Sequence, residues 1–586
     1  MAPAADASSI ALRTQNDFVD EREAQHTISA EPLAKPENKT AKAIGRAGWF
    51  APLVQALAAL LWLPQAALLA MGIGNVAAGR GMADIEWLVA GVVTIGIARA
   101  LLDAVGSRLA FRAARHVLSE KRKRSITTLS ARSPLDMDRP ASGHAASVLA
   151  EQAEAIVPYL SRFRPARLKA TIVPVAIVLC VLPISWAAAV VLLISAPLIP
   201  IFMALIGWRA KAASEQQLVE MGGMNGFLLD RLRGLATIRS LDAVELTAGR
   251  LRANAESLRT RTMAVLRIAF LSSAVLELFA ALGVAMVAVY IGFHLLGQLN
   301  FGAWGERLSL NEGLFILLLA PAFFEPLREL SSVWHDRAAG EAAMDALDRL
   351  SENGIAMSGA GSSGNRPIFP TGGASRVRIE SLRFRHSTGK PAVFDGFDLH
   401  VAPGERVALL GASGTGKSTL LALMAGLAPY QSGRISIGGT PLTVTTAAEL
   451  RAGIAWVGQK PHIFAGSVSD NVALGRPEVG PNETQIALQK AALSEVANAH
   501  GHASVGEGGS GLSGGEVLRL AIARAAANPD AGLILADEPT AHLDTATANH
   551  ITESLLAISA GKTLIVATHD PVLANRMDRI ITLEGV

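Results

Sequence analysis

Long apolar stretches dominate the first 330 residues of the chain and predict helices that cross a membrane. No charged residue occurs from Ala47 to Gly79. A spanning helix needs about 20 apolar residues, so this stretch predicts one span, with a kink at Pro64. A second charge-free stretch runs from Ala170 to Trp208. It is too long for one span and predicts two, which turn near Pro183–Trp186.

Further apolar segments bring the predicted number of spans to six: Trp87–Phe111, Ile268–Gln298 and a segment that starts near Gly313. The charged residues within these segments include Arg99, Asp103, Glu277 and Arg328. Charged side chains are costly inside a membrane, so we consider these four as candidates for a transport path. The alternative is that they form structural pairs inside the bundle. Arg99 and Asp103, four apart on one helix face, can pair in this way.

The basic residues predict how the spans are oriented. Thirteen Lys and Arg residues lie within 108–169 and ten within 209–267, whereas the three opposite connections hold Arg80 and Arg307. The positive-inside rule therefore places both long loops, the N-terminus and the C-terminal half in the cytoplasm. Both loops have helical patterns, for example Gln216–Leu235. We therefore expect the membrane helices to continue past the bilayer.

Polar segments divide the chain into domains. Residues 1–45 predict a cytoplasmic tail rather than a secretory signal. Residues 46–345 form the expected transmembrane domain, and the Gly- and Ser-rich residues 351–375 predict a flexible linker. Residues 376–586 alternate strand and helix patterns, which is typical of an α/β nucleotide-binding fold.

Composition supports a membrane protein. The 586 residues are 50% hydrophobic and 18% charged, with a mean hydropathy of +0.34, whereas soluble domains average about 25% charged residues. This disfavours a soluble ATPase that acts on DNA or ribosomes, and a net charge of +3 is too small to indicate nucleic-acid binding. The single cysteine, Cys180, excludes an internal disulfide and a CxxC redox pair. We expect it to be a small buried hydrophobe.

A glycine-rich loop predicts phosphate binding. It fits the spacing GxxxxGK[ST] and consists of Gly411, Ala412, Ser413, Gly414, Thr415, Gly416, Lys417, Ser418 and Thr419. An apolar run, Val407–Leu410, precedes it, and a helical run follows. The backbone N–H groups of such a loop and of the helix start face an anion. Lys417 would reach the β- and γ-phosphates and Ser418 would bind Mg²⁺, so the pattern predicts a nucleoside-triphosphatase.

Two carboxylates follow a second apolar run, Gly532–Ala536. Asp537 at the end of this predicted strand suits a Mg²⁺ contact. Glu538 beside it can polarise the attacking water as a general base, a role worth about 10²–10⁴ in rate. An acidic pair alone is a weak signal, but together with the Gly411 loop it is a strong signal for a nucleoside-triphosphatase.

The segment Leu512–Glu516, Leu-Ser-Gly-Gly-Glu, provides a second helix start that can bind an anion. Ser513 can cap the following helix, and Gly514 and Gly515 leave its N–H groups accessible. With these residues the chain resembles an ATP-binding cassette, in which the Gly411 loop is Walker A, this segment is the signature, and Asp537 with Glu538 ends Walker B.

The resemblance extends to further motifs and implies roles for them. Gln459 matches the Q-loop, which reaches Mg²⁺ and the attacking water, Asp544 ends the D-loop, and His569 matches the switch histidine at the γ-phosphate. In this family two cassettes stack head to tail, and the signature of one closes on the ATP of the other, which implies a dimer. Two positions depart from the family: Glu516 replaces the commoner Gln, and His386 stands where an aromatic residue, usually Tyr, stacks on adenine.

Six spans fused ahead of a cassette resemble the exporter branch of ABC transporters. Ser142–Ile156 and Phe227–Arg250 resemble its coupling helices. More narrowly, three segments resemble the D-type subunit of the thiol exporter needed for cytochrome bd assembly, the CydDC family: Ser273–Ala280, Val287–Phe293 and Phe315–Arg328.

That resemblance implies an ATP- and Mg²⁺-dependent exporter in the bacterial inner membrane. It would move cysteine or glutathione from cytoplasm to periplasm by alternating access, as a heterodimer with a C-type subunit, and it allows for haem. The residues alone do not select the substrate. An apolar bundle with Arg99, Glu277 and Arg328 suits a small thiol, but it equally suits a drug or lipid carried by a homodimeric exporter. Intact Glu538 and His569 disfavour a channel or receptor gated by the cassettes.

Overall fold

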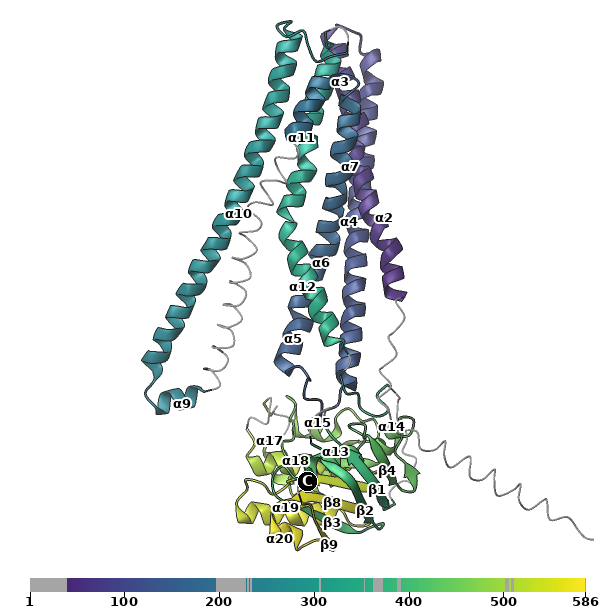
Figure 1. Ribbon diagram of the computed structural model, residues 1–586, viewed down its shortest axis with the longest axis vertical. Coiled ribbons are helices and arrows are strands. Elements are labelled where there is room, and N and C mark those ends of the chain that lie inside the picture. Colours follow the sequence, from purple (N-terminus) through teal and green to yellow (C-terminus); the bar gives the residue numbers. More distant parts are fainter. Residues whose placement is uncertain are drawn as a thin grey trace, which may run out of the picture. The chain divides into compact units, whose positions relative to one another are not determined.

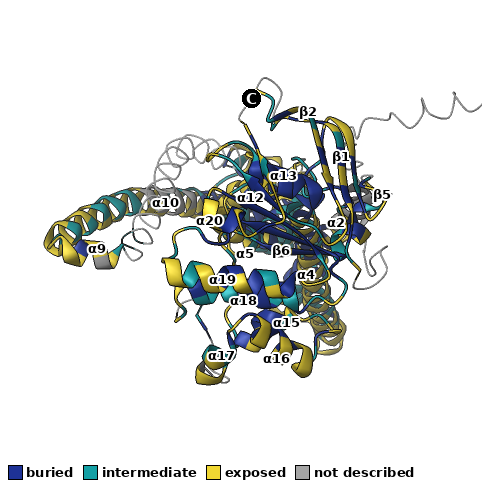
Figure 2. Ribbon diagram, turned by 90° about the horizontal axis from the view of Figure 1, so that it is seen from below, coloured by how far each residue is buried: buried dark blue, intermediate teal, exposed yellow. Residues whose placement is uncertain are grey.

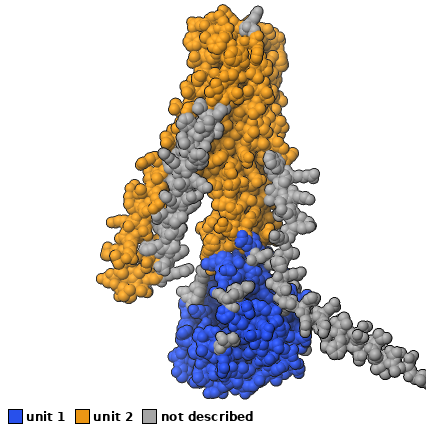
Figure 3. Space-filling model, in the orientation of Figure 1, with its two compact units in different colours: residues 1–35, 126–141, 351–586 blue, residues 36–125, 142–350 orange. Residues whose placement is uncertain are grey.

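The computed structural model describes residues 39–195, 228, 231, 234–304, 307–352, 354–361, 373–386, 391–500, 505, 506 and 511–584. The chain divides into two compact units (Figure 3). The cassette unit contains residues 126–141 and 351–586, and the membrane unit contains residues 36–125 and 142–350. Most of the predicted N-terminal tail and of the segments Gln216–Leu235 and 362–372 lies outside the described residues.

The membrane unit is built from helices (Figure 1). In chain order they are α2 (Lys39–Leu60), α3 (Trp62–Ala77), α4 (Ala83–Ala131), α5 (Ser142–Ala150), η1 (Gln152–Ala155), α6 (Ile156–Pro158), η2 (Tyr159–Phe163), α7 (Arg164–Val181), α9 (Leu235–Ser240), α10 (Val244–Leu295), α11 (Leu310–Ser332) and α12 (Trp334–Leu350).

Four helical stretches in the described residues are long and apolar enough to cross a membrane: Phe50–Ala77, Ala83–Ala131, Glu277–Leu295 and Leu310–Leu350. They correspond to the first, second, fifth and sixth predicted spans. The third predicted span is α7, and after a turn at residues 182–185 the apolar helix Trp186–Ser195 begins the fourth. The predicted turn is thereby confirmed, while residues 196–208 lie outside the described part of the chain.

Several helices are longer than a bilayer requires. α4 has 49 residues and α10 has 52, so at 1.5 Å per residue they measure roughly 74 and 78 Å. The hydrocarbon core is about 30 Å thick. The prediction that spans continue as helices beyond the membrane is therefore confirmed for α4 and α10.

The first span is interrupted close to Pro64. α2 ends at Leu60 and α3 begins at Trp62. Because proline has no N–H group, Pro64 cannot donate to the carbonyl of Leu60, and the helix breaks one turn before it. The predicted kink therefore has a direct structural counterpart.

A buried apolar cluster holds the membrane bundle together. It includes Phe323 and Phe324 of α11, Ile177 of α7 and Val287 of α10. Cys180 lies outside this cluster, and the prediction that it is buried is wrong. Its neighbours on α7, Val175 and Leu179, are also exposed, so Cys180 belongs to an apolar outer face. A spanning helix can direct such a face toward lipid. The expectation that an apolar cysteine is buried holds for soluble proteins and does not account for this.

The cassette unit contains two sheets. The strands are β1 (Val377–Phe384), β2 (Phe394–Val401), β3 (Arg406–Leu410), β4 (Ser432–Ile437), β5 (Thr440–Pro441), β6 (Ile454–Val457), β7 (Leu533–Asp537), β8 (Thr563–Thr568) and β9 (Arg579–Thr582). An antiparallel sheet has the order β2-β1-β4-β5, and a parallel sheet has the order β6-β7-β8-β3-β9. The central strands β7 and β8 are buried throughout, as parallel strands covered on both faces are.

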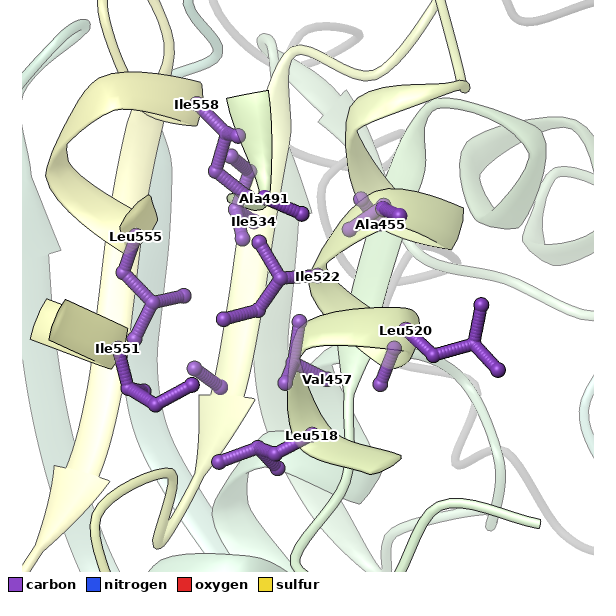
Figure 4. Packing of buried hydrophobic residues seen from close by; sticks show 14 of the residues in the cluster. Ala455, Val457, Ala491, Leu518, Leu520, Ile522, Ile534, Ile551, Leu555 and Ile558 are labelled. Carbon is purple, nitrogen blue, oxygen red and sulfur yellow. The ribbon is translucent and has the colours of Figure 1, made fainter. Parts of the chain in front are cut away.

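Helices complete the cassette: α13 (Lys417–Met424), α14 (Ala447–Ala452), α15 (Val468–Ala473), α16 (Pro481–Lys490), α17 (Ser494–His500), α18 (Gly514–Ala526), α19 (Thr545–Ile558) and α20 (Pro571–Ala574). Residues of α18 and α19, such as Ile522 and Leu555, point with Ile534 of β7 into one apolar cluster (Figure 4). Figure 2 shows exposed residues on the outer side of α19. Leu420 and Leu421 of α13 lie in a second cluster with β1 and β3.

Part of the predicted flexible linker is held by hydrogen bonds within the cassette unit. Arg132 and Ala356 form an antiparallel bridge, and the N–H of Ser133 donates to the carbonyl of Ile355 at 2.8 Å. Arg132 also forms a buried ion pair with Asp136, 2.8 Å apart. Residues 126–141, which the sequence places in the first long loop of the transmembrane domain, thus belong structurally to the cassette unit.

Candidate nucleotide site and membrane charges

The glycine loop connects β3 to α13, so the predicted order of strand, loop and helix is confirmed. Gly414 and Gly416 have φ angles of 90° and 91°, which favour glycine because it has no Cβ. A Cβ at Gly416 would also lie 2.6 Å from Val393. The loop therefore requires glycine both for its backbone conformation and, at Gly416, for its close packing. The free N–H groups at the start of α13 face an anion placed on it.

Lys417 is folded over this loop. Its Nζ donates to the carbonyl oxygens of Gly411 at 2.7 Å and Ala412 at 3.0 Å, and lies 3.4 Å from the carboxylate of Glu538. The side chain is only 5% exposed. A phosphate on the loop can replace these contacts with stronger charge-assisted hydrogen bonds, so the lysine is already positioned at the anion site.

Ser418 and Asp537 form the adjoining pair. The Ser418 hydroxyl donates to Asp537 Oδ1 at 2.9 Å, which joins the start of α13 to the end of β7. Burial raises the pKa of the Asp537 carboxyl, while the hydrogen bond from Ser418 partly opposes this shift. A hydroxyl beside a desolvated carboxylate suits Mg²⁺, because the cation would stabilise the buried negative charge.

Glu538 and His569 meet above the ends of neighbouring strands. Glu538 follows β7 and His569 follows β8, and the Glu538 carboxylate is 2.7 Å from His569 Nδ1. The backbone N–H of His569 donates to the same oxygen at 3.3 Å. Glu538 has a φ of 50°, an uncommon conformation for a residue other than glycine that often marks functional sites. The structure therefore brings Lys417, Glu538 and His569 together as a chain of contacting polar side chains.

Gln459 and His386 follow two other strands, β6 and β1. Gln459 follows β6 at the carboxyl edge of the parallel sheet and is exposed. His386 follows β1, and its ring contacts Phe384 edge to face, with centroids 5.2 Å apart. Its Nδ1 is buried without a hydrogen-bond partner in the described residues. The contact with Phe384 fixes the imidazole, whose face remains the surface available for stacking on a base.

The signature segment begins α18 with a capping box. Ser513 accepts a hydrogen bond from the N–H of Glu516 at 3.4 Å, and the Glu516 carboxylate accepts one from the N–H of Ser513 at 2.7 Å. Either Glu or Gln can serve in this box, which explains how Glu516 is accommodated. Nothing lies within 4 Å of the Cβ position of Gly514, so the space beside it is free. A Cβ at Gly515 would lie 2.6 Å from Thr547, so this position favours glycine. The hydrogen bonds of Ser513 stay within its own helix start.

Asp544 has a local role that the motif alone does not show. It is the N-cap of α19, and its carboxylate accepts hydrogen bonds from the Thr547 hydroxyl at 2.6 Å and the Thr547 N–H at 3.0 Å. These bonds, that from the hydroxyl foremost, lower the pKa of the Asp544 carboxyl. The D-loop residue is therefore held in its charged form beside the start of α19.

In the membrane unit, the predicted pair of Arg99 with Asp103 is not formed between these two described residues. The Arg99 guanidinium instead lies 5.2 Å from the ring centre of Trp62 on α3. The indole Nε1 of Trp62 donates to the carbonyl of Leu318, which fixes the ring. A cation–π contact on a fixed ring avoids ordering two flexible side chains, and Asp103 remains exposed.

The other two candidates, Glu277 and Arg328, do meet. Arg328 of α11 donates to both oxygens of Glu277 on α10, at 3.1 and 3.2 Å, and to Glu325 at 2.9 Å. Lys169 of α7 lies 2.6 Å from Glu329. The sequence analysis missed Lys169, Glu325 and Glu329. The spacing of 325, 328 and 329 on one helix face is the signal that could have found two of them.

Comparisons with known proteins agree with this architecture. The family described as "ABC transporter transmembrane region" matches residues 49–315, and the family described as "ABC transporter" matches residues 394–541. The Escherichia coli (strain K12) "Glutathione/L-cysteine transport system ATP-binding/permease protein CydD" is 36% identical to the chain, over 81% of it and 80% of that protein. The CydC protein of the same description from Bacillus subtilis (strain 168) is 28% identical over 91% of each.

A solved structure confirms the fold class. The "Structure of a bacterial Atm1-family ABC exporter with ATP bound" matches with a TM-score of 0.69 and covers 94% of both chains, at 21% identity. The fold and the nucleotide site thus define a membrane transporter that hydrolyses ATP, with an exporter-type transmembrane domain ahead of its cassette. The chain belongs to the ABC transporter family, and within it to the half-transporters of the CydD type.

Proposed function

We propose that this half-transporter exports a small thiol, cysteine or glutathione, from the cytoplasm to the periplasm and thereby supports cytochrome bd assembly. The observation that carries the proposal is the likeness to CydD, which extends over about four fifths of both chains and includes the membrane half. Glutathione and cysteine are the substrates named for that relative. An intact Lys417, Glu538 and His569 network supports a pump rather than a gate.

In the proposed cycle, the residues of this chain bind and position MgATP. The Gly411 loop and Lys417 hold the β- and γ-phosphates, His386 stacks on the base, and Ser418, Asp537 and Gln459 hold Mg²⁺. The cation neutralises phosphate charge during phosphoryl transfer. Glu538 accepts the proton of the attacking water, and His569 orients Glu538 and contacts the γ-phosphate.

The proposed partner is a C-type subunit. In a head-to-tail pair, Ser513, Gly514 and Gly515 of this chain close on ATP held by the partner, and Asp544 lies at the shared interface. The CydD and CydC relatives are named as parts of the same kind of transport system, which supports two different subunits. ATP binding favours the closed pair and hydrolysis releases it, so that the membrane halves alternate their access.

The proposed location is the bacterial inner membrane, with the cassette and the long helical extensions in the cytoplasm. The distribution of Lys and Arg between the two sides supports this orientation. Haem is a separate question. In the apolar stretch Glu277–Leu295 the histidine is His294, which is buried and whose Nδ1 accepts the N–H of Leu308 at 3.3 Å. This does not fit an open haem ligand, and we derive no step through haem.

The proposal is tested by ATPase measurements in lipid vesicles. This chain is reconstituted with and without a co-expressed C-type partner and titrated with cysteine and glutathione. Thiol stimulation that requires the partner, and that is lost with Glu538→Gln, is the expected result. Full activity of this chain alone, unaffected by thiols but raised by amphiphiles, would instead identify a homodimeric drug or lipid exporter.

A further inference from the structure

Five charged side chains lie together on three helices of the membrane bundle, and we call them the charge cluster: Lys169, Glu277, Glu325, Arg328 and Glu329. Arg328 bridges Glu277 of α10 and Glu325 of its own helix. Lys169 of α7 pairs with Glu329, the next residue on α11. The charge cluster thus connects α7, α10 and α11 through ion pairs, in addition to the apolar packing of these helices.

The charge cluster lies at one level of the bundle. Glu277 lies eighteen positions before Leu295, where α10 ends, and Arg328 follows the start of α11 at Leu310 by eighteen positions. At 1.5 Å per residue, both lie about 27 Å from those helix ends. The hydrocarbon core is about 30 Å thick. Both residues therefore lie at one membrane boundary, which is the cytoplasmic one in the proposed orientation.

The charge cluster is accessible. The side chains of Glu277 and Glu325 are 63% and 70% exposed, and that of Arg328 is 30% exposed. Charges that face lipid are costly, so exposed charges in spanning helices face water-filled space. Nε of Arg328 is buried and has no acceptor among the described residues. The guanidinium therefore has hydrogen-bonding capacity that its two carboxylates do not use.

The charge balance favours a particular solute. The charge cluster holds three carboxylates and two cations, so one negative charge is in excess, and two carboxylates share Arg328. An ammonium group would neutralise the excess, and its attraction to Glu277 and Glu325 would free Arg328 to bind a carboxylate in bidentate fashion. A small amino acid carries both groups on one carbon.

We infer that the charge cluster is the binding site for the amino-acid head group of the exported thiol, with Glu277 and Glu325 on the ammonium and Arg328 on the carboxylate. This inference rests on the proposed function and narrows it. Zwitterionic cysteine matches the charge cluster better than glutathione, which carries one more carboxylate than ammonium. The preferred substrate is therefore the free amino acid.

The first test is competition for uptake of labelled cysteine into inside-out vesicles that contain this chain and its C-type partner. Four unlabelled thiols are compared: cysteine, glutathione, N-acetylcysteine, which lacks the ammonium, and cysteamine, which lacks the carboxylate. We expect both analogues to compete at least tenfold more weakly than cysteine. N-acetylcysteine or glutathione competing as well as cysteine would overturn the inference.

The second test uses variants in the same vesicles. Glu277→Gln should raise the KM for cysteine about tenfold or more, and Glu277→Asp should recover part of the loss. The matched control is Glu256→Gln, which removes an exposed carboxylate that pairs with Arg259 elsewhere on α10 and should leave the KM unchanged. If Glu277→Gln does not assemble, the competition series decides alone.

The outcomes separate this inference from the function on which it rests. If the wild-type pair takes up no cysteine and no glutathione, the proposed function fails, and the assignment of the charge cluster fails with it. If the wild type takes up cysteine and Glu277→Gln does so with an unchanged KM, only the assignment of the charge cluster is overturned.

Discussion

The side chains of the nucleotide site contact one another directly. Lys417 contacts the carbonyls of its own loop and lies 3.4 Å from Glu538, which in turn contacts His569. Ser418 holds Asp537. Such contacts position the reacting groups in advance, so that little reorganisation is needed when the phosphates arrive.

Glu538→Gln should stop turnover while ATP still binds. The amide keeps an oxygen that can accept from the N–H of His569, but it cannot take a proton from water. We expect hydrolysis to fall by about 10²–10⁴, with ATP trapped in a closed pair and with normal assembly. Single-turnover hydrolysis and retention of labelled ATP measure this directly. Undiminished steady-state hydrolysis at this chain's site would rule out Glu538 as the base.

Asp537→Asn should stabilise the nucleotide-free protein at alkaline pH. Burial raises the pKa of Asp537 above its ordinary value, so its contribution to stability is full below the ordinary carboxyl range and is lost as the pH rises through the raised pKa. The amide avoids this loss and can still accept from Ser418. We expect the Tm of the full-length variant to exceed that of wild type by roughly 2 °C at pH 8.

We also expect a smaller Tm difference between Asp537→Asn and wild type near pH 4.5, and loss of Mg²⁺-dependent hydrolysis in the variant. A variant Tm below that of wild type at pH 8 would mean that burial of Asp537 is compensated in the nucleotide-free state.

Sequence motifs predicted that Lys417, Asp537 and Ser513 lie at helix and strand ends, because each motif is local. A few adjacent residues and one helix or strand end fix Lys417, Asp537 and Ser513. The pairing of Arg99 with Asp103 and the burial of Cys180 were wrong because both depend on neighbours distant in the chain. Arg99 lies over the ring of Trp62, and Cys180 lies on the exposed apolar face of α7.

At the scale of elements, α12 packs on the short η2 helix at a point where only glycine fits. A Cβ on Gly340 would lie 2.2 Å from the Cβ of Tyr159 and 3.1 Å from the carbonyl oxygen of Ala155. η2 has π-helical hydrogen bonding, a rare form often found at functional positions. The ring of Phe163 contacts Trp334 at the start of α12, so the two elements are joined at several points.

Gly340→Ala should weaken this contact. The added methyl meets backbone and a Cβ that cannot turn away, and overpacking of this kind costs about 1–3 kcal/mol. Gly249→Ala on α10 is the matched control, because nothing lies within 4 Å of its Cβ position and alanine favours a helix interior by up to about 1 kcal/mol. Thermal unfolding in detergent should show a lower Tm for Gly340→Ala only, and equal values would contradict the packing argument.

Most elements followed from the sequence pattern, and the exceptions have physical reasons. Apolar runs located the spans and the cassette strands β3 and β7. The π-helical turn of η2 was not predictable, because residues 159–163 have an ordinary helical composition and the deviation arises from packing on α12. The hydrogen bonds of residues 354–361 were likewise hidden, because they depend on a partner segment over 200 positions away.

At the scale of the whole molecule, the two units are interleaved in sequence. Residues 126–141 leave the membrane unit, join the cassette unit and return. The Arg132–Asp136 pair within this segment is nearly fully buried, and removing one member of such a pair costs about 3–5 kcal/mol because the other charge is left unpaired.

Asp136→Ala should therefore release residues 126–141 and 354–361 from the cassette unit. We expect their amide hydrogen exchange to accelerate by about 10²–10⁴, since local opening follows the lost free energy. The control is Glu154→Ala, which removes two partly exposed ion pairs, with Arg115 and with Arg122, each worth about 0–1 kcal/mol. Similar exchange in both variants would show that burial of the pair does not hold the segment.

The interleaving also bears on how such genes can be divided and recombined. A fragment that starts at the linker codes for a cassette without Leu135, which lies against its apolar core, and without Arg132, which bridges Ala356. Such a fragment would lack these contacts, so rate constants measured on it would differ from those of the cassette in the full chain. For the same reason, a natural exchange of cassettes between transporters succeeds only where the incoming cassette accepts the host's residues 126–141.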